Sequence, residues 1–324
     1  MLQSFFHSKK TLPIVLSFAL FAVQAVFLQL SNPVLMPSKQ FMGFDIFPWF
    51  SGYEGLKFGL FILAALWLGV IVLRVHYHHI KVKQQHFGVF LLHVICFPVW
   101  MKVFGMAYEW FAALLIFSTF YRMLSMYQVE KNHALVYDSG VKLALATLLW
   151  PQSIIFLAFF ILLWMVYSSP SPRLFGVALL GFLSPLAFLA VYLFWTDQLD
   201  FFFHCLWPNH WVLDWPYALS FSLAQWLGIG MVSLFAFLGL MQFFVGMRDW
   251  GIKQRKAVWL LIGMSLLSLF VLPFRGQSMA AVFPLFWPFL LLFSMEFLGK
   301  KRKKWLAESL WLLFLGGHLA LWIW

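Results

Sequence analysis

The stretch "FLAFFILLWMVY", residues 156–167, decides the fold class of this chain. Every side chain in it is apolar or aromatic, so it lacks the alternation of apolar and polar positions that marks the strands of a membrane β-barrel. Such a segment belongs in hydrocarbon, where no water is present and each backbone N–H and C=O group must be bonded within the chain. The stretch therefore predicts an α-helix, and similar runs recur along the whole sequence.

The composition extends this prediction to the whole chain. The 324 residues are 63% hydrophobic and 10% charged, whereas a soluble domain carries about 25% charged residues. We predict an all-α, polytopic transmembrane bundle that forms a single integral domain over residues 1–324, with 1–195 and 220–324 as candidate halves joined by a periplasmic loop at 196–219. The basic residues divide the chain into about eleven spans (nine to eleven), and the first is expected to remain as an uncleaved helix. The predicted spans are 12–30, 56–73, 87–104, 107–121, 137–150, 153–168, 174–195, 220–246, 257–273, 279–298 and 306–323.

The basic residues also predict the orientation, because short cytoplasmic loops are enriched in Lys and Arg. With the N-terminus inside, all 22 basic residues except Lys39, Lys57, Lys102 and Arg275 fall on the cytoplasmic side. An odd number of spans then places the C-terminus on the periplasmic side. The net charge of +11 lies in short loops beside the spans, where anionic lipid attracts it, so we expect lipid rather than nucleic acid as its partner.

Residues 137–168 are predicted to form a hairpin that bends at "WPQS". A single helix of this length would rise about 48 Å, which is more than a bilayer core of about 30 Å accommodates. Pro151 favours the bend because it has no N–H group and clashes with the preceding turn. The two arms are short, so both a full crossing and a re-entrant hairpin remain open.

The stretch "TDQLDFFFHCLWPNHWVLDWP", residues 196–216, gathers acids and histidines in a predicted outer loop. If 197–207 is helical, Asp197, Asp200 and His204 share one face. Asp200 and His204 can then act as an acid/base pair or hold a divalent ion. The alternative is an amphipathic helix that lies in the membrane interface without any chemistry.

A second outer candidate is "LPFRGQSMAAVFPLFWP", residues 272–288. Arg275 lies where Pro273 and Gly276 interrupt the helix, and its guanidinium can bind a phosphate or a carboxylate through two parallel hydrogen bonds. Gln277 and Ser278 would donate further hydrogen bonds to the same anion. The alternative is an arginine that extends to the lipid headgroups.

Histidines supply the remaining candidates. The tract "RVHYHHIK" places His76, His78 and His79 in a predicted polar turn on the cytoplasmic side, with metal binding as the alternative. His93 and His318 lie inside predicted spans, where a role in helix packing is favoured over a proton relay. The two cysteines do not form a Cys-x-x-Cys pair, and no nucleotide-binding or metalloprotease motif occurs, so we expect no cofactor and no metal.

The block from 120 to 197 resembles an uncharacterised family of polytopic inner-membrane proteins of Bacteroidota. The residues behind the resemblance are Arg122, Ser125, Asp138 and Pro185, and the run from Pro273 to Glu296 is similar to the late part of that family. The resemblance implies a location in the bacterial inner membrane and no particular activity.

A more distant similarity in layout links the chain to membrane glycosyltransferases that use polyprenyl-phosphate sugars. By that similarity Asp45, in the outer loop 31–55, would be the base and Arg275 would hold the lipid phosphate. The function that we expect first is a structural or accessory component of a cell-envelope assembly, with a membrane-protein partner. A lipid-linked glycosyl or phosphoryl transferase at the periplasmic face is the alternative, and a secondary transporter is the next; whether the chain is an enzyme stays open.

Overall fold

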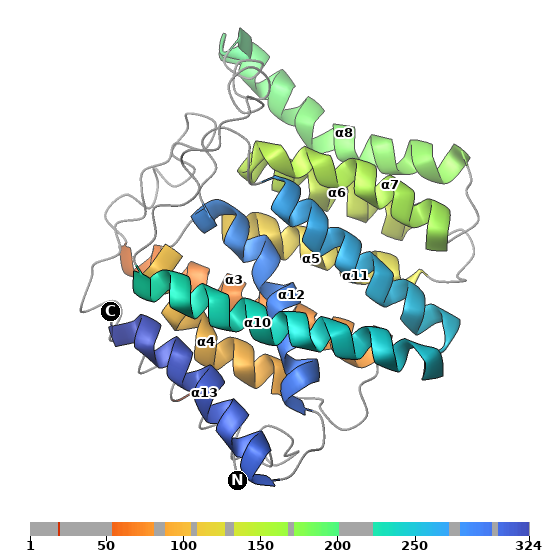
Figure 1. The fold of residues 1–324 in the computed structure, drawn as a ribbon. Coiled ribbons are helices and arrows are strands. Elements are labelled where there is room, and N and C mark those ends of the chain that lie inside the picture. Colours follow the sequence, from red (N-terminus) through yellow and green to blue (C-terminus); the bar gives the residue numbers. More distant parts are fainter. Residues whose placement is uncertain are drawn as a thin grey trace.

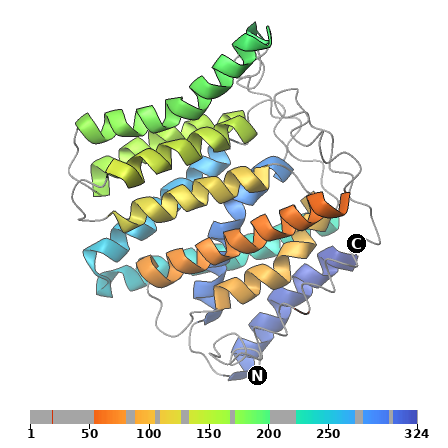
Figure 2. The same ribbon diagram turned by 180° about the vertical axis from the view of Figure 1, so that it is seen from behind.

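The computed structural model describes residues 19, 54–80, 88–104, 109–126, 133–167, 172–200, 223–271, 279–299 and 304–323. Every regular element in these ranges is a helix, and the helices lie side by side in one bundle (Figures 1 and 2). The elements are α3 (Glu54–Val75), the π-helix η2 (His76–Ile80), α4 (Gly88–Phe104), α5 (Glu109–Ser125), α6 (His133–Leu149), η3 (Pro151–Ile154), α7 (Ile155–Tyr167), α8 (Pro172–Trp195), α10 (Leu223–Gly246), η5 (Met247–Asp249), α11 (Ile252–Phe270), α12 (Met279–Gly299) and α13 (Lys304–Ile323).

The predicted fold class is confirmed, since the described chain is all-α. A helix lies at each predicted span from 56–73 onward, whereas the span predicted at 12–30 falls outside the described residues apart from residue 19. Within the described part, three helices are long and apolar enough to cross a membrane: Gly59–Ile80, Pro172–Trp195 and Ile229–Gly246. The chain is therefore a helical membrane protein.

The bend at "WPQS" also occurs where it was predicted. Helix α6 ends at Leu149, and the short 3-10 helix η3 leads directly into α7. Trp150, Gln152 and Ser153 at this bend are all buried. Ser153 Oγ donates a hydrogen bond to Thr147 Oγ1 at 3.2 Å, and Thr147 Oγ1 donates in turn to the carbonyl of Leu143 at 2.9 Å. The turn of the hairpin is therefore packed inside the protein.

Helix α12 lies at the centre of the bundle. It packs against α3, α4, α5, α10, α11 and α13, and Figure 1 shows it crossing behind α10. Its closest approach is to α10, where a Cβ atom added to Gly239 would collide with the carbonyl group of Phe293. Because lipid tails are as apolar as leucine, helices in a membrane associate through such close packing rather than through the hydrophobic effect.

Helices α6 and α8 are joined by a reciprocal glycine contact. A Cβ atom on Gly140 of α6 would collide with the carbonyl oxygen of Ala178, and one on Gly181 of α8 would collide with that of Tyr137. The two backbones therefore touch at both positions. The hydroxyl groups of Tyr137 and Ser184 lie 3.0 Å apart and form a hydrogen bond between the same helices.

Helix α8 contains Pro185, and Figures 1 and 2 show that the helix bends along its length and that its far end leaves the bundle. Pro185 has no N–H group to offer the carbonyl of Gly181 one turn earlier. Ser184 Oγ instead donates a hydrogen bond to that carbonyl at 3.1 Å. Past the bend the helix exposes large apolar side chains, with Phe188 78% and Trp195 86% exposed.

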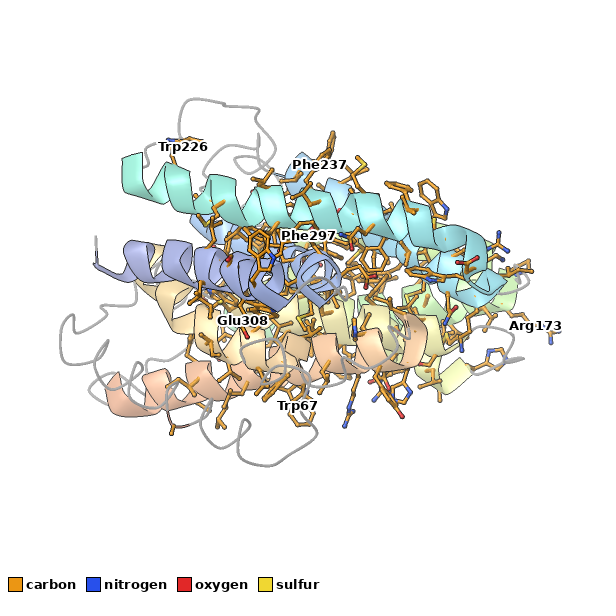
Figure 3. The ribbon with its side chains drawn as sticks, turned by 60° about the horizontal axis from the view of Figure 1, so that its bottom comes forward. Trp67, Arg173, Trp226, Phe237, Phe297 and Glu308 are labelled. Carbon is orange, nitrogen blue, oxygen red and sulfur yellow. The ribbon has the colours of Figure 1, made fainter. Side chains whose placement is uncertain are left out.

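Basic residues gather at one end of the bundle, which we call the basic end. Arg74 lies in the last turn of α3, Arg122 in the last turn of α5, and Arg173 and Lys253 in the first turns of α8 and α11. Figure 3 shows Arg173 at this end and Trp226, in the first turn of α10, at the opposite end. These four basic residues therefore lie at the same end of the described helices.

The glycine contact between α6 and α8 can be tested by substituting Gly181→Leu. The added side chain meets the backbone of α6, which cannot move aside as a side chain can, and overpacking of this kind costs about 1–3 kcal/mol or more. We expect a lower unfolding temperature of the protein purified in detergent. Gly176→Leu, in the same helix, is the matched control because a Cβ atom there meets nothing within 4 Å. Equal unfolding temperatures for the two variants would contradict the contact.

Candidate functional site

The histidine tract at the basic end is not the polar turn that the sequence predicted. Helix α3 continues to Val75 and passes into the π-helix η2, so His76 and His79 point into the protein and are only 1% and 2% exposed. His78 remains exposed. The wider turn of a π-helix changes the direction in which successive side chains point, and such segments are frequent at functional sites. The prediction of an exposed turn was wrong because it relied on the polar composition of the tract. In the structure the tract continues a helix and packs against neighbouring helices.

Two other helices complete the surroundings of these histidines. Tyr121, in the last turn of α5, lies against both rings, with its ring centroid 5.8 Å from that of His79 and 6.2 Å from that of His78. The first turn of α11 packs on η2 and brings Lys253 close enough for its positive charge to act on His79. Four titratable side chains from three elements thus share one small region.

Neither ring nitrogen of His79 has a hydrogen-bond partner among the described residues. A neutral imidazole offers one donor and one acceptor. Burying such groups without partners costs free energy, so in most proteins they are paired with protein atoms or with ordered water. His79 is therefore the unusual member of this cluster.

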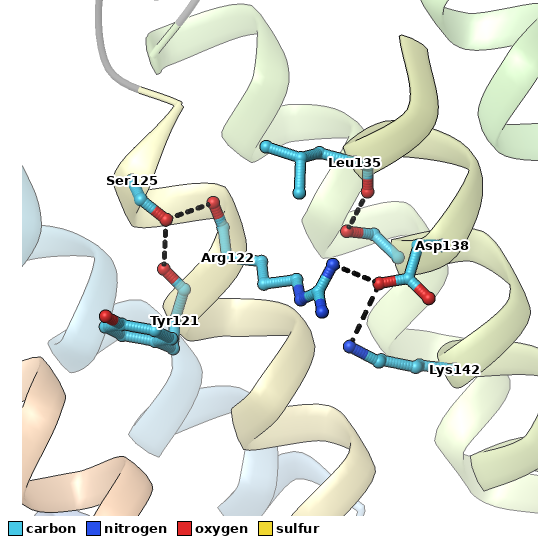
Figure 4. A network of polar contacts seen from close by, with 7 residues as sticks. Tyr121, Arg122, Ser125, Leu135, Asp138 and Lys142 are labelled. Atoms are coloured by element: carbon cyan, nitrogen blue, oxygen red, sulfur yellow. Dashed lines mark hydrogen bonds and ion pairs between the residues drawn. The ribbon is translucent and has the colours of Figure 1, made fainter. Parts of the chain in front are cut away.

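A salt-bridge network occupies the other side of α5. Arg122 pairs with Asp138 of α6, and Lys142 Nζ lies 3.1 Å from the same carboxylate oxygen. Figure 4 shows that Arg122 and Tyr121 point in opposite directions from α5, toward α6 and toward α3 respectively. Ser125 Oγ donates to the carbonyls of Tyr121 and Arg122 at 3.0 and 2.8 Å, which bonds the last turn of α5 to itself.

The buried histidine inside the bundle, His93, is by contrast fully hydrogen-bonded. The indole N–H of Trp287 in α12 donates to His93 Nδ1 at 3.1 Å, which leaves Nε2–H to donate to the carbonyl of Ala65 in α3 at 2.9 Å. The ring also lies against Gly69, where a Cβ atom would come within 2.5 Å of its Cδ2. This geometry joins α3, α4 and α12 and favours the packing role that was predicted for His93. The side chain of His318 lies outside the described residues.

Most candidate residues of the predicted outer loops lie outside the described part, namely Asp45, His204, Arg275, Gln277 and Ser278. Asp200 is described, and its side chain is exposed beyond the end of α8.

Asp197 lies outside the helix that was considered for 197–207, because it terminates α8. It adopts the left-handed conformation with φ 54°, which aspartate tolerates better than most residues. Its N–H donates to the carbonyl of Phe194 at 3.2 Å, and the N–H of Gln198 donates to that of Leu193 at 2.8 Å. These two bonds form a Schellman cap. Asp197 and Asp200 are therefore not spaced along one helix face.

The chemistry open to the basic end is the binding of anions. Among the described residues, no group of three or more His, Cys, Asp or Glu side chains is placed to hold a metal ion. The groups that meet at η2 are imidazole, phenol and ammonium groups, which can donate hydrogen bonds to an anion.

Comparison of the chain with family models, with curated proteins and with solved structures finds no match. The resemblance to the Bacteroidota family and the similarity to the glycosyltransferases therefore stay predictions. The structure does bring together two residues of the first resemblance, since Arg122 and Asp138 form an ion pair.

The sequence indicated some of these residues and not others. It placed the histidine tract, Arg122 and Lys253 on one predicted side of the membrane, which is the signal that could have grouped them. It did not indicate that Tyr121 lies against the histidine rings. It also did not indicate that Trp287 donates a hydrogen bond to His93, because the two residues are 194 positions apart in the sequence. Neither pairing has a local pattern, because each depends on how distant helices pack.

The bond between Trp287 and His93 can be tested with Trp287→Phe. This change leaves His93 Nδ1 buried without a donor, which costs about 1–3 kcal/mol, in addition to the lost volume. Trp110→Phe is the matched control, because Trp110 is equally buried and its indole nitrogen has no hydrogen-bond partner among the described residues. We expect Trp287→Phe to lower the unfolding temperature in detergent clearly more than Trp110→Phe does. Similar losses for both variants would show that only volume matters.

Proposed function

We propose that this chain is an eleven-span protein of the bacterial inner membrane that acts as a non-enzymatic, accessory component of a cell-envelope assembly. In this proposal the basic end is cytoplasmic, in keeping with the excess of Lys and Arg in cytoplasmic loops, so that the N-terminus is cytoplasmic and the C-terminus periplasmic. The helices that lie at each predicted span from 56–73 onward support the span count.

The observation that favours an accessory role is the position of α8. Its main neighbour is α6, and beyond Pro185 it presents an apolar and aromatic face at the edge of the bundle that includes Phe188, Val191 and Trp195. Pro185, Ser184 and the glycine contact hold this helix in place. A helix that is anchored on one side and directed outward is suited to pack against an apolar transmembrane helix of a partner.

The interior of the described bundle agrees with this role. The single histidine buried between α3, α4 and α12 has both ring nitrogens engaged, so it is held as a packing element rather than left available to carry protons. The transferase alternative depends on Asp200, which is described and exposed, and on Asp45, His204 and Arg275, which lie outside the described residues. The functional test below is therefore designed to distinguish the transferase from the accessory role.

The proposed orientation can be tested by cysteine labelling. In a background with Cys96→Ala and Cys205→Ser, Gln198→Cys reports on the end of α8 and Arg255→Cys on the start of α11; both native side chains are exposed. In intact spheroplasts we expect a membrane-impermeant maleimide to label position 198, and to label position 255 only after permeabilisation. Labelling in the reverse order would place the basic end outside.

The proposed contact surface on α8 can be tested by photo-crosslinking in living cells. A benzophenone amino acid at Phe188 or Val191 should give one protein adduct of defined mass, because a partner helix would cover these positions. The same group at Trp259 or Leu266 of α11, which are also exposed (56% and 62%), is the matched control and should give none.

Two outcomes would contradict the accessory role. One is an identical crosslinking pattern from α8 and α11, which means that both helices face lipid alone. The other is loss of the cellular function in Asp45→Asn or Arg275→Ala at normal protein abundance, since removal of an essential base or phosphate-binding residue costs several kcal/mol of transition-state stabilisation. The second outcome would favour the transferase.

A further inference from the structure

His79 and His93 offer an internal comparison between two buried imidazoles of one protein. His93 has a donor on one ring nitrogen and an acceptor for the other. His79 is as buried, yet neither of its ring nitrogens has a hydrogen-bond partner among the described residues. Because native structures rarely leave buried polar groups unsatisfied, this difference points to a binding partner for His79 that the described residues do not supply.

The charges around His79 indicate the sign of that partner. Lys253 and His78 are the groups whose charge acts on it, and neither is an acid. The carboxylate of Asp138 is engaged by Arg122 and Lys142 on the other side of α5. A cation at His79 would be repelled by Lys253, whereas an anion would be attracted and could accept hydrogen bonds from both side chains.

The position of the cluster indicates the class of anion. The π-helix η2 ends the apolar helix Gly59–Ile80, which is long enough to cross a membrane, so His79 lies where such a span reaches the headgroup layer. Phosphate is the anionic group common to lipid headgroups, and basic pockets between transmembrane helices bind such headgroups.

We propose that η2, the end of α5 and the start of α11 form a binding site for a phosphate group, in which His79 and Lys253 donate hydrogen bonds and Tyr121 packs against the imidazole. The phosphate belongs either to an anionic lipid or to a free phosphate ion. This inference does not depend on the accessory role proposed above, since it concerns the opposite end of the bundle from the exposed end of α8.

The test uses the purified full-length chain and two variants. His79→Phe keeps an aromatic ring beside Tyr121 and removes both nitrogens, and Lys253→Gln removes the positive charge. The matched controls are His133→Phe and Arg255→Gln, which make the same changes at exposed positions in the first turns of α6 and α11. Unfolding temperatures are measured in detergent with inorganic phosphate against chloride at equal ionic strength, and in nanodiscs of phosphatidylcholine with and without phosphatidylglycerol.

We expect one of the two phosphate sources to raise the unfolding temperature of the wild type and of both controls. His79→Phe and Lys253→Gln should weaken the binding about tenfold or more, because each loses a donor that is charged or desolvated. A shift with inorganic phosphate identifies free phosphate, and a shift with phosphatidylglycerol alone identifies a lipid headgroup. Phosphate also stabilises proteins generally by exclusion from their surface, so the difference between variants and controls is the decisive quantity.

Two results would overturn the proposal. One is the absence of any shift in the wild type with either source. The other is an equal shift in Lys253→Gln and Arg255→Gln, which would mean that only the general positive charge of this end matters. If His79→Phe does not fold, the comparison of Lys253→Gln with Arg255→Gln decides the question by itself.

Discussion

The close packing of α12 against its neighbours is the interaction on which the rest of this bundle depends. Helices in hydrocarbon gain little from the hydrophobic effect when they associate, so contact area and hydrogen bonds must hold them together. Helix α12 supplies both: its backbone touches α10 at Gly239, and Trp287 bonds to His93. Through His93 the same helix is linked to the carbonyl of Ala65 in α3. One buried chain of hydrogen bonds therefore links α12 to α3 and α4, two helices far from it in the sequence.

The same requirement explains how the edge of the molecule is built. Helix α8 has α6 as its main neighbour, and small residues make that single contact sufficient because Gly140 and Gly181 let the two backbones touch. Pro185 then directs the remainder of the helix away from the bundle, while Ser184 bonds to the carbonyl that the proline leaves without an N–H. The exposed apolar face of the part beyond Pro185 is the basis of the accessory role that we propose.

Buried polar side chains that hold the helices together differ from His79, the candidate binding residue, in their hydrogen bonding. Deep in the bundle, His93 is bonded on both sides, and the hydroxyl groups of Thr147 and Ser153 bond to the chain around the α6–α7 bend. At the basic end the ion pair of Arg122 with Asp138 fastens α5 to α6. His79 differs from all of these because its nitrogens have no partner within the described chain. The binding site that we propose therefore lies at the basic end, rather than in the predicted outer loops that contain Asp200 and Arg275.

The sequence by itself determined the fold class, the places of the helices from residue 56 onward and the bend at "WPQS". These follow from local physics, namely the need to bond every backbone group in hydrocarbon and the missing N–H of proline. Only the tertiary structure decided that His76 and His79 are buried, that Asp197 ends α8 instead of beginning a helix, and that Trp287 donates to His93. Each of these depends on which helices are neighbours and how they are rotated. The neighbours and rotations of the helices are determined by contacts between residues far apart in the chain. Composition and spacing along the sequence do not predict such contacts.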